Sequence, residues 1–325
     1  MNPERRRLLA AAALLPVAAA VRAASEEYPD RPVRLVVPFP PGGGADNLAR
    51  AIMPKVSQAL GKPIIIDNKP GAGGNVGAEL VAHSPPDGYT LLYGTNGTHS
   101  INQALYRQLR FDPIKDFAPV SRMTEIAAML VVNPQLPVMT TTQLIRYALA
   151  NPGKVNFASA GNGTTSHLSG ELFRTMAGID IVHIPYRGGA AAVADLISGQ
   201  VQMMIDVMPN VYPLAKDGRI RGLAVSTSVR FPGAPELPTI AESGVPGFEA
   251  SAWDGVLAPA GTPEAIVNKL NAAIRTALAD PELVEALKGR GARPVAGTPQ
   301  EFAQHIAEST KKWAVVVKAS GAHID

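Results

Sequence analysis

The 325-residue chain contains no cysteine. This absence excludes disulfide bonds, thiol catalysis, cysteine metal ligands and a lipid anchor on an N-terminal cysteine. Exported proteins can carry disulfides but do not need them, so the absence is compatible with export. The chain also has only one long apolar run, at its N-terminus, and we expect the remainder to be free in solution.

Motifs typical of catalysis are missing as well. The chain has no HExxH motif, no two histidines four residues apart and no GxSxG elbow. Gly71, Gly73 and Gly77 follow a predicted strand, but their spacing does not match the GxGxxG fingerprint of dinucleotide sites. The sequence therefore predicts no catalytic residue, no metal ligand and no cofactor, and we expect a protein that is not an enzyme.

Residues 1–23 are typical of a signal peptide. Residues 5–7 are all arginine, an apolar run follows from 8 to 21, and residues 21–23 (VRA) predict cleavage after Ala23. The run falls short of the roughly 20 apolar residues of a membrane-spanning helix, which disfavours a permanent anchor. The adjacent arginines leave both the Sec and the twin-arginine export routes open. In a bacterium with two membranes, we expect the mature chain in the periplasm.

The net charge of +3 belongs to this leader. Residues 1–23 hold four arginines and one glutamate, so residues 24–325 hold 26 basic and 26 acidic residues. Nucleic-acid binding requires a basic face for the phosphates, and the neutral mature chain argues against it.

Short apolar runs alternate with amphipathic helical patterns along the mature chain. Leu48, Ile52 and Val56, for example, lie on one face of a helix predicted over residues 46–60. Strands are predicted at 33–37, 63–67, 89–93, 127–132, 155–159, 181–185, 201–206 and 222–226. This alternation predicts an α/β fold with mostly parallel sheets, and the chain length indicates about two domains.

Two glycine-rich loops between a strand and a helix are candidate anion sites. Residues 40–46 (PPGGGAD) follow the first strand, and residues 159–167 (SAGNGTTSH) follow the strand at 155–159. Glycine lets the backbone approach a ligand closely, and the amides at a helix N-terminus attract an anion. A plain turn explains either loop alone. Two loops placed alike in successive α/β units favour a binding site.

Three side chains near these loops are further candidates. His167 lies in the second loop. Asp46 and Asp206 could form a carboxylate pair at two strand ends, although the sequence does not show that they converge. The simpler interpretation is a helix cap for Asp46 and a strand-end hydrogen bond for Asp206.

The mature chain resembles the Bug receptors, the extracytoplasmic substrate-binding proteins of tripartite tricarboxylate transporters. The resemblance rests on six motifs that occur in the family's order: residues 37–46 (VPFPPGGGAD), 68–74 (NKPGAGG), 159–168 (SAGNGTTSHL), 184–189 (IPYRGG), 237–244 (LPTIAESG) and 258–263 (APAGTP). No single motif is decisive, but the ordered set is specific and covers essentially the whole mature chain.

The resemblance implies a two-lobed Venus flytrap fold of the type II periplasmic-binding-protein class, in which the chain crosses between the lobes twice. Crossings near residues 122–126 and 226–231 imply that lobe 1 comprises residues 24–124 plus 229–325 and lobe 2 residues 125–228. The resemblance also implies that amides and hydroxyls, rather than arginine, hold a ligand carboxylate. Carried over by position, the ligand-binding residues are Phe39, Gly42, Gly43, Gly44, Ala45, Asp46, Asn96, Ser159, Ala160, Gly161, Thr164, Thr165, His167 and Asp206.

The function implied is that of a periplasmic solute-binding protein. It would capture a small organic carboxylate between its lobes and deliver it to the membrane subunits of a tripartite tricarboxylate-type transporter, and we expect it to be a monomer. A sensor of the same fold that signals to a membrane kinase is the alternative. A periplasmic hydrolase or isomerase that uses His167 is less favoured. The sequence leaves the identity of the carboxylate open.

Overall fold

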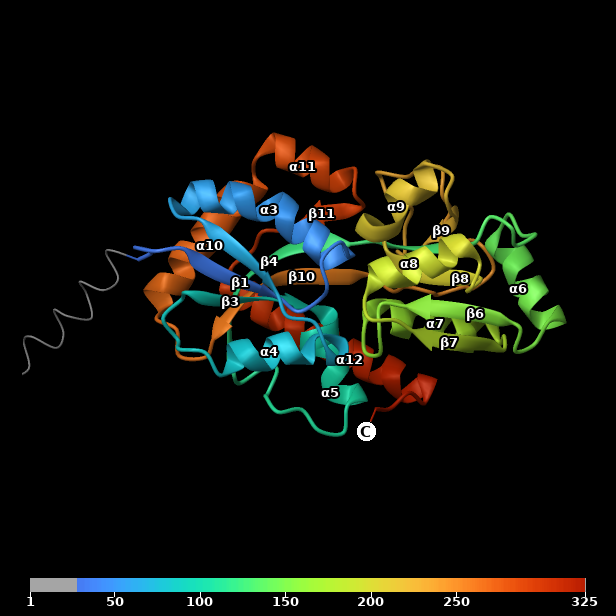
Figure 1. The fold of residues 1–325 in the computed structure, drawn as a ribbon, viewed down its shortest axis with the longest axis horizontal. Helices are drawn as coiled ribbons and strands as arrows, with labels where there is room; N and C mark the ends of the chain where they lie inside the picture. The colour runs from blue at the N-terminus through green and yellow to red at the C-terminus, as the bar shows by residue number, and fades with distance from the viewer. Residues whose placement is uncertain (1–27, 325) are drawn as a thin grey trace, which may run out of the picture.

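The computed structural model describes residues 28–324 as an elongated α/β molecule with two sheets side by side (Figure 1). The predicted signal peptide, residues 1–23, lies outside the described residues. Within residues 28–324, no helix is both long and apolar enough to cross a membrane.

The first sheet has six strands in the order β11-β4-β10-β3-β1-β2. Their bounds are β1 (Val33–Val37), β2 (Ile64–Asn68), β3 (Thr90–Thr95), β4 (Phe117–Ile126), β10 (Ala252–Pro259) and β11 (Ala292–Pro294). β1 runs parallel to β2 and β3, whereas β10 runs antiparallel to β3 and β4. The loops after β1 and β3 therefore leave the same edge of the sheet.

The second sheet has five strands in the order β7-β6-β8-β5-β9. Their bounds are β5 (Ala128–Val132), β6 (Val155–Ser159), β7 (Ile181–Pro185), β8 (Met203–Val207) and β9 (Arg221–Val225). β6 runs parallel to β7 and β8, so the loops after these three strands also leave one common edge.

Helices cover both faces of each sheet (Figure 1). Their bounds are α3 (Gly44–Leu60), η1 (Ala72–Gly74), α4 (Asn75–Ala82), η2 (Gly97–Ile101), α5 (Asn102–Leu105), α6 (Thr141–Ala150), α7 (Thr165–Ala177), α8 (Gly189–Ser198), α9 (Met208–Lys216), α10 (Glu264–Leu278), α11 (Pro281–Lys288) and α12 (Pro299–Ser320). The predicted stripe of Leu48, Ile52 and Val56 on α3 is buried against β1 and β3, together with α10. The periodicity in the sequence thus identified the face of α3 that packs on the sheet.

The chain crosses between the sheets twice. It passes from β4 to β5 at residue 127, and it returns from β9 to β10 through residues 226–251. The buried hydroxyl of Ser226 joins the two crossings, because it donates to the carbonyl oxygen of Ala250 at 2.7 Å and accepts from the amide of Ala128 at 3.1 Å. The predicted two-lobed α/β fold is confirmed.

Helix α12 packs against the cores of both lobes. Phe302 and Ile306 near its start pack in the core of the first sheet. Trp313 and Val317, three turns later, pack in the core of the second sheet. The C-terminal helix therefore connects the lobes in addition to the two crossings.

Strand β4 and helix α9 are among the elements that were not predicted, and both have sequences that obscure them. β4 mixes polar and apolar residues because buried Ser121 and Thr124 face hydrogen-bonding partners rather than an apolar core. α9 contains Pro209 and Pro213. Proline is tolerated in the first turn of a helix, where its missing amide would have no partner inside the helix, but the pair obscures a helical pattern.

Candidate functional site

A cavity lies between the two lobes, where the loops after β1, β3, β6, β7 and β8 meet. It encloses about 660 Å³ of empty space, including open solvent at its mouth. The residues that line it are Phe39, Pro40, Gly43, Gly44, Ala45, Tyr93, Thr95, Asn96, Gly97, Ile126, Ala160, Thr164, Thr165, Ser166, Gly189, Asp206, Val207, Ala252, Trp253 and Asp254. The structure thus brings together nine of the fourteen predicted ligand-binding residues.

The N-terminus of α3 opens into this cavity. Its N-cap is Gly43, which has no side chain to cap the helix, and the first bond inside the helix runs from the amide of Asn47 to the carbonyl of Gly43. The amides of Gly44 and Ala45 come before that bond and have no acceptor within the helix. They form the first nest of donors, with the helix dipole behind them.

The N-terminus of α7 supplies a second nest, from the other lobe. The Thr164 side chain caps the amide of His167, which leaves the amides of Thr165 and Ser166 for a ligand. The hydroxyl of Thr165 donates to Oδ1 of Asn96 at 2.8 Å and so ties the two lobes together. This contact leaves Nδ2 of Asn96, a residue only 1% exposed, without a partner among the described residues.

A third nest comes from α8 and was missed in the sequence. Its first bond runs from the amide of Ala192 to the carbonyl of Gly188, so the amide of Gly189 at the cavity wall has no acceptor within the helix. Residues 184–189 (IPYRGG) carry the same signal as the other two loops, since a strand ends and glycines precede a helix. Helix dipoles from both lobes therefore converge on one space.

Asp46 and Gly42 are predicted residues that lie behind the first nest. Oδ2 of Asp46 accepts from the amide of Gly42 at 3.0 Å and from Nε of Arg50 at 2.9 Å. Nδ2 of Asn68 donates to Oδ1 at 3.0 Å. Burial works to raise the pKa of Asp46, but these hydrogen bonds outweigh it and hold the pKa below its usual value. Asp46 thus fixes the loop and does not line the cavity.

Ser159, Gly161 and His167 lie behind the second nest in the same way. Oγ of Ser159 accepts from the amide of Gly161 at 3.2 Å and bonds Nε2 of His183 at 2.6 Å. The ring of His183 stacks on that of His167 with centroids 4.2 Å apart. Burial lowers the pKa of His167 to about 4 and that of His183 to about 3, so both rings are neutral at pH 7. These residues support the loop from outside the cavity.

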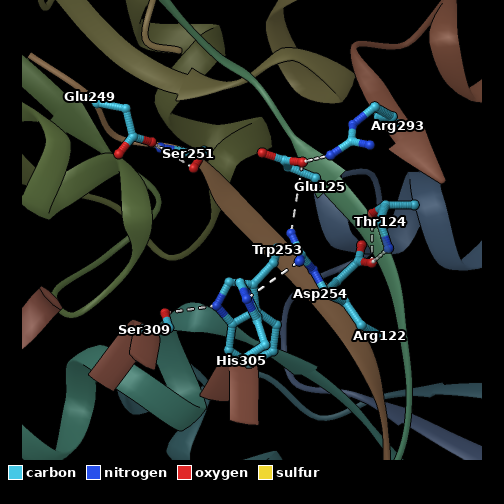
Figure 2. Close-up of polar contacts among 10 residues, drawn as sticks. All are labelled: Arg122, Thr124, Glu125, Glu249, Ser251, Trp253, Asp254, Arg293, His305 and Ser309. Carbon is cyan, nitrogen blue, oxygen red and sulfur yellow. Dashed lines mark hydrogen bonds and ion pairs between the residues drawn. The ribbon is translucent and has the colours of Figure 1, made fainter. Parts of the chain in front are cut away.

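Residues of β3, β4 and β10 form the remaining wall. Figure 2 shows polar contacts of Trp253 and Asp254 on β10 and of Thr124 on β4. The buried Tyr93 hydroxyl donates to Oδ2 of Asp254, whose Oδ1 accepts from the amide and the hydroxyl of Thr124. Trp253 directs its indole toward α12 and donates from Nε1 to Oγ of Ser309 at 2.9 Å. The polar tips of this wall are therefore engaged within the protein, and its surface is largely apolar.

Two buried carboxylates reach the cavity, and the described part of the chain puts no lysine, arginine or histidine on its walls. Burial raises the pKa of Asp206 to about 6, partly offset by hydrogen bonds from Asn210 and from the amide of Val207. Burial likewise raises the pKa of Asp254 to about 6, against the hydrogen bonds from Thr124 and Tyr93. Any positive potential in the cavity thus comes from backbone dipoles.

Comparison with known proteins identifies the family. The model of the tripartite tricarboxylate transporter family receptor matches residues 48–322. The chain belongs to this receptor family.

Relatives match over nearly their full lengths. Protein BugT of Bordetella pertussis is 38% identical over 98% of this chain and 98% of its own length. The solved structure of Rpa4515 of Rhodopseudomonas palustris with adipate is 42% identical, covers 91% of this chain and 100% of that one, and has a TM-score of 0.89. MatC of the same organism, with bound malate, is 38% identical, covers 89% of this chain and 100% of that one, and has a TM-score of 0.85.

The two lobes of this receptor touch around the cavity through glycines. A Cβ on Gly44 would lie 2.5 Å from Cγ2 of Val207, and a Cβ on Gly188 would lie 2.8 Å from Cγ of Pro40. These separations are shorter than carbon contacts allow, so only glycine permits the approach. The structure thus shows the lobes closed on each other.

A second hollow in the receptor holds a cluster with metal-binding residue types, His167, Glu171 and His183, whose candidate ligand atoms lie within 4.8 Å of one another. Two observations argue against a metal here. The imidazole rings are stacked with an interplanar angle of 19°, so their in-plane lone pairs do not converge. The Glu171 carboxylate is engaged by the Arg174 guanidinium at 2.7 Å. The cluster packs and braces the second nest.

Proposed function

We propose that this protein is a periplasmic receptor that captures a small organic carboxylate between its lobes and delivers it to the membrane subunits of a tripartite tricarboxylate-type transporter. The observation that carries the proposal is the convergence of three helix N-termini, from both lobes, on a cavity without a basic side chain among its lining residues. Adipate in Rpa4515 and malate in MatC support a carboxylate as the ligand class.

In the proposed mechanism, hydrogen bonding to the ligand is coupled to closure of the lobes. Hydrogen bonds from amides to a carboxylate contribute about 1.5–3 kcal/mol each, because one partner is charged. An anion satisfies all three nests only when the lobes are closed, so its binding energy favours the closed form. Several such bonds offset the entropy of closure and give an affinity of roughly micromolar.

We further propose the division of labour between the lobes. Residues 24–124 with 229–325 form lobe 1 and contribute α3 and Asn96 to the ligand, and residues 125–228 form lobe 2 and contribute α7 and α8. The closed receptor is a monomer that the membrane subunits recognise, and it returns the ligand unchanged.

A binding screen tests the proposal. The mature protein is titrated with adipate, malate, benzoate, nicotinate and glutamate while its thermal unfolding is followed. A ligand at 100 times its dissociation constant adds about 2.7 kcal/mol of stability. Recovery of the unchanged compound after long incubation tests the absence of turnover, and a failure of every carboxylate to stabilise the folded protein would overturn the proposal.

A substitution at the first nest localises the site. Gly43→Leu places a bulky side chain between α3 and Gly189. We expect it to lower the affinity for the tightest-binding carboxylate by more than tenfold. Gly289→Leu is the matched control, because Gly289 caps α11 away from the cavity with a backbone that any residue adopts. Undiminished binding by Gly43→Leu would show that the ligand lies elsewhere.

A further inference from the structure

Asp206 places a carboxylate where an anion is expected to bind. It lies in β8, where the strand leads into α9, lines the cavity and is 4% exposed. A Cβ on Gly189 would lie 3.2 Å from its Oδ2. An anion held by the amide of Gly189 therefore lies beside Asp206.

The first nest lies against the same residues. A Cβ on Gly44 would meet Cγ2 of Val207 at 2.5 Å and Cβ of Asn210 at 3.8 Å. Val207 follows Asp206 directly in the chain, and Asn210 lies one helical turn further on. Nδ2 of Asn210 donates to Oδ2 of Asp206 at 2.5 Å, which fixes the carboxylate at this point. Nests from both lobes thus direct an anion toward a buried acid.

Two carboxylates so close in a space without a cation repel each other, and one proton removes the conflict. We propose that the receptor binds its carboxylate together with one proton, which Asp206 holds and donates in a hydrogen bond to the ligand. The ligand enters as the anion, the proton comes from solvent onto the Asp206 carboxylate, and both are lost on opening. Asp206 is then a specificity-determining residue that selects hydrogen-bond acceptors. This inference rests on the proposed function.

The surroundings of Asp206 agree with this assignment. Burial raises its pKa to about 6 before any ligand arrives, and no charged side chain is among the causes of the shift. Across the cavity, the carboxylate of Asp254 is engaged by Tyr93 and Thr124. The ionisable side chains on the helices that pack around Asp206 have partners of their own or lie outside the cavity. Those on the helices are Asp46, Arg50 and Lys55 on α3, His167, Glu171 and Arg174 on α7, Asp195 on α8, and Tyr212 and Lys216 on α9. An arriving anion raises the pKa of Asp206 further and draws a proton from neutral solution.

Isothermal titration calorimetry measures how many protons are taken up when the ligand binds. The tightest carboxylate of the screen is titrated at pH 7.5 in phosphate, Hepes and Tris, whose ionisation enthalpies differ, and the dependence of the heat on buffer gives the number of protons taken up. We expect close to one proton per ligand for the natural protein. We also expect its affinity to fall about tenfold per pH unit between the pKa of Asp206 in the free protein, about 6, and its higher pKa in the complex.

Asp206→Asn is the decisive variant, because it keeps the size and acceptor of Asp206 and supplies a permanent donor. We expect it to bind with undiminished affinity, with close to zero protons taken up and with little pH dependence. A tenfold or greater loss of affinity would instead mean that Asp206 accepts a bond from a donor on the ligand, and it would overturn the inference. So would proton uptake that persists in Asp206→Asn but vanishes in Asp254→Asn.

The two proposals fail in distinguishable ways. Carboxylate binding without proton uptake by the natural protein would overturn this inference and leave the proposed function standing. Absence of binding by every carboxylate of the screen would overturn both.

Discussion

Asn96 shows how a buried side chain is prepared for a ligand. Its amide group is almost fully buried, its oxygen is engaged by the hydroxyl of Thr165 from the other lobe, and its nitrogen has no partner within the described residues. An unpaired buried donor costs about 1–3 kcal/mol unless something accepts from it. A ligand carboxylate would remove that cost.

Asn96→Asp tests this role. The aspartate can still accept from Thr165, but it loses the donor and adds a negative charge, so we expect ligand affinity to fall by about 10–100-fold, or 1.4–2.7 kcal/mol. Asn75→Asp is the control, because Oδ1 of Asn75 already accepts from Asn102 and the residue does not line the cavity. Equal effects of the two substitutions on Kd would contradict the role of Asn96.

Asp206 also predicts a pH dependence of stability. Its pKa is raised to about 6 in the folded protein, so its protonated form stabilises the fold at low pH and this contribution is lost as the pH rises through 6. Asp206→Asn removes the buried charge. At pH 7.5 we expect the free energy of unfolding of the variant, measured in urea, to exceed that of the natural protein by on the order of 3 kcal/mol at most. We expect this difference to vanish near pH 4.

Asp46 serves as a control, because its pKa is shifted in the opposite direction to that of Asp206. Its pKa is held below the usual value, so its stabilising contribution is present at neutral pH and is lost as the pH falls. Asp46→Asn is therefore expected to be less stable than the natural protein at pH 7.5. Parallel behaviour of the two variants would contradict the assignment of these shifts.

At the scale of elements, the site is built from helix beginnings rather than from side chains. α3 and α8 begin at glycines that cannot cap them, and α7 is capped by Thr164 on one amide only. Uncapped amides are costly in an isolated helix, and they become useful where an anion is to be bound.

The substitution Gly44→Ala distinguishes the stability of helix α3 from ligand binding at its N-terminus. Alanine favours a helix over glycine by up to about 1 kcal/mol, so we expect the free protein to be equally or more stable to heat. The new Cβ would meet Val207 of the other lobe, so closure is impeded and we expect ligand affinity to fall tenfold or more. Gly289→Ala should leave the affinity unchanged. Tight binding by Gly44→Ala would show that the lobes need not approach as closely as they do here.

The sequence predicted strands well where they are short apolar runs. The strands at 33–37, 155–159 and 181–185 have the predicted bounds, because each is a short apolar run that ends at turn residues. The sequence did not predict β4, because a search for apolar runs does not detect a buried polar residue such as Thr124. Thr124 is buried because it pairs with Asp254, which lies 130 residues away in the chain. A partner so distant in sequence cannot be predicted from local pattern.

At the scale of the whole molecule, residues 28–324 form three connections between the lobes besides the contacts that surround the cavity. Two are the crossings, joined by the hydroxyl of Ser226, and the third is α12, with Phe302 in one core and Trp313 in the other. The contacts of Ser226 lie where the chain must bend when the lobes move. They fix the crossings relative to each other without filling the cavity.

Ser226→Ala tests this junction. It leaves the amide of Ala128 and the carbonyl of Ala250 short of a buried partner, so we expect a loss of about 1–3 kcal/mol in the free energy of unfolding, measured in urea. Ser228→Ala is the matched control, since Ser228 is exposed in the same segment and should change stability by less than about 0.5 kcal/mol. A loss no larger than that of Ser228→Ala would show that the junction is not held by this hydroxyl.

The sequence by itself determined the α/β alternation, the glycine-rich loops at 40–46 and 159–167 and the family resemblance, because these depend on residues that are neighbours in the chain. Only the tertiary structure decided which side chains face the cavity. It turned Asp46 and His167 to the outer side of their loops, brought Gly189 to the first nest and set Asp206 beside both. Asp46 is held by Asn68 and His167 by His183 within their own lobes, whereas the placing of Gly189 and Asp206 depends on contacts between lobes. All of these contacts form only when segments far apart in sequence pack together.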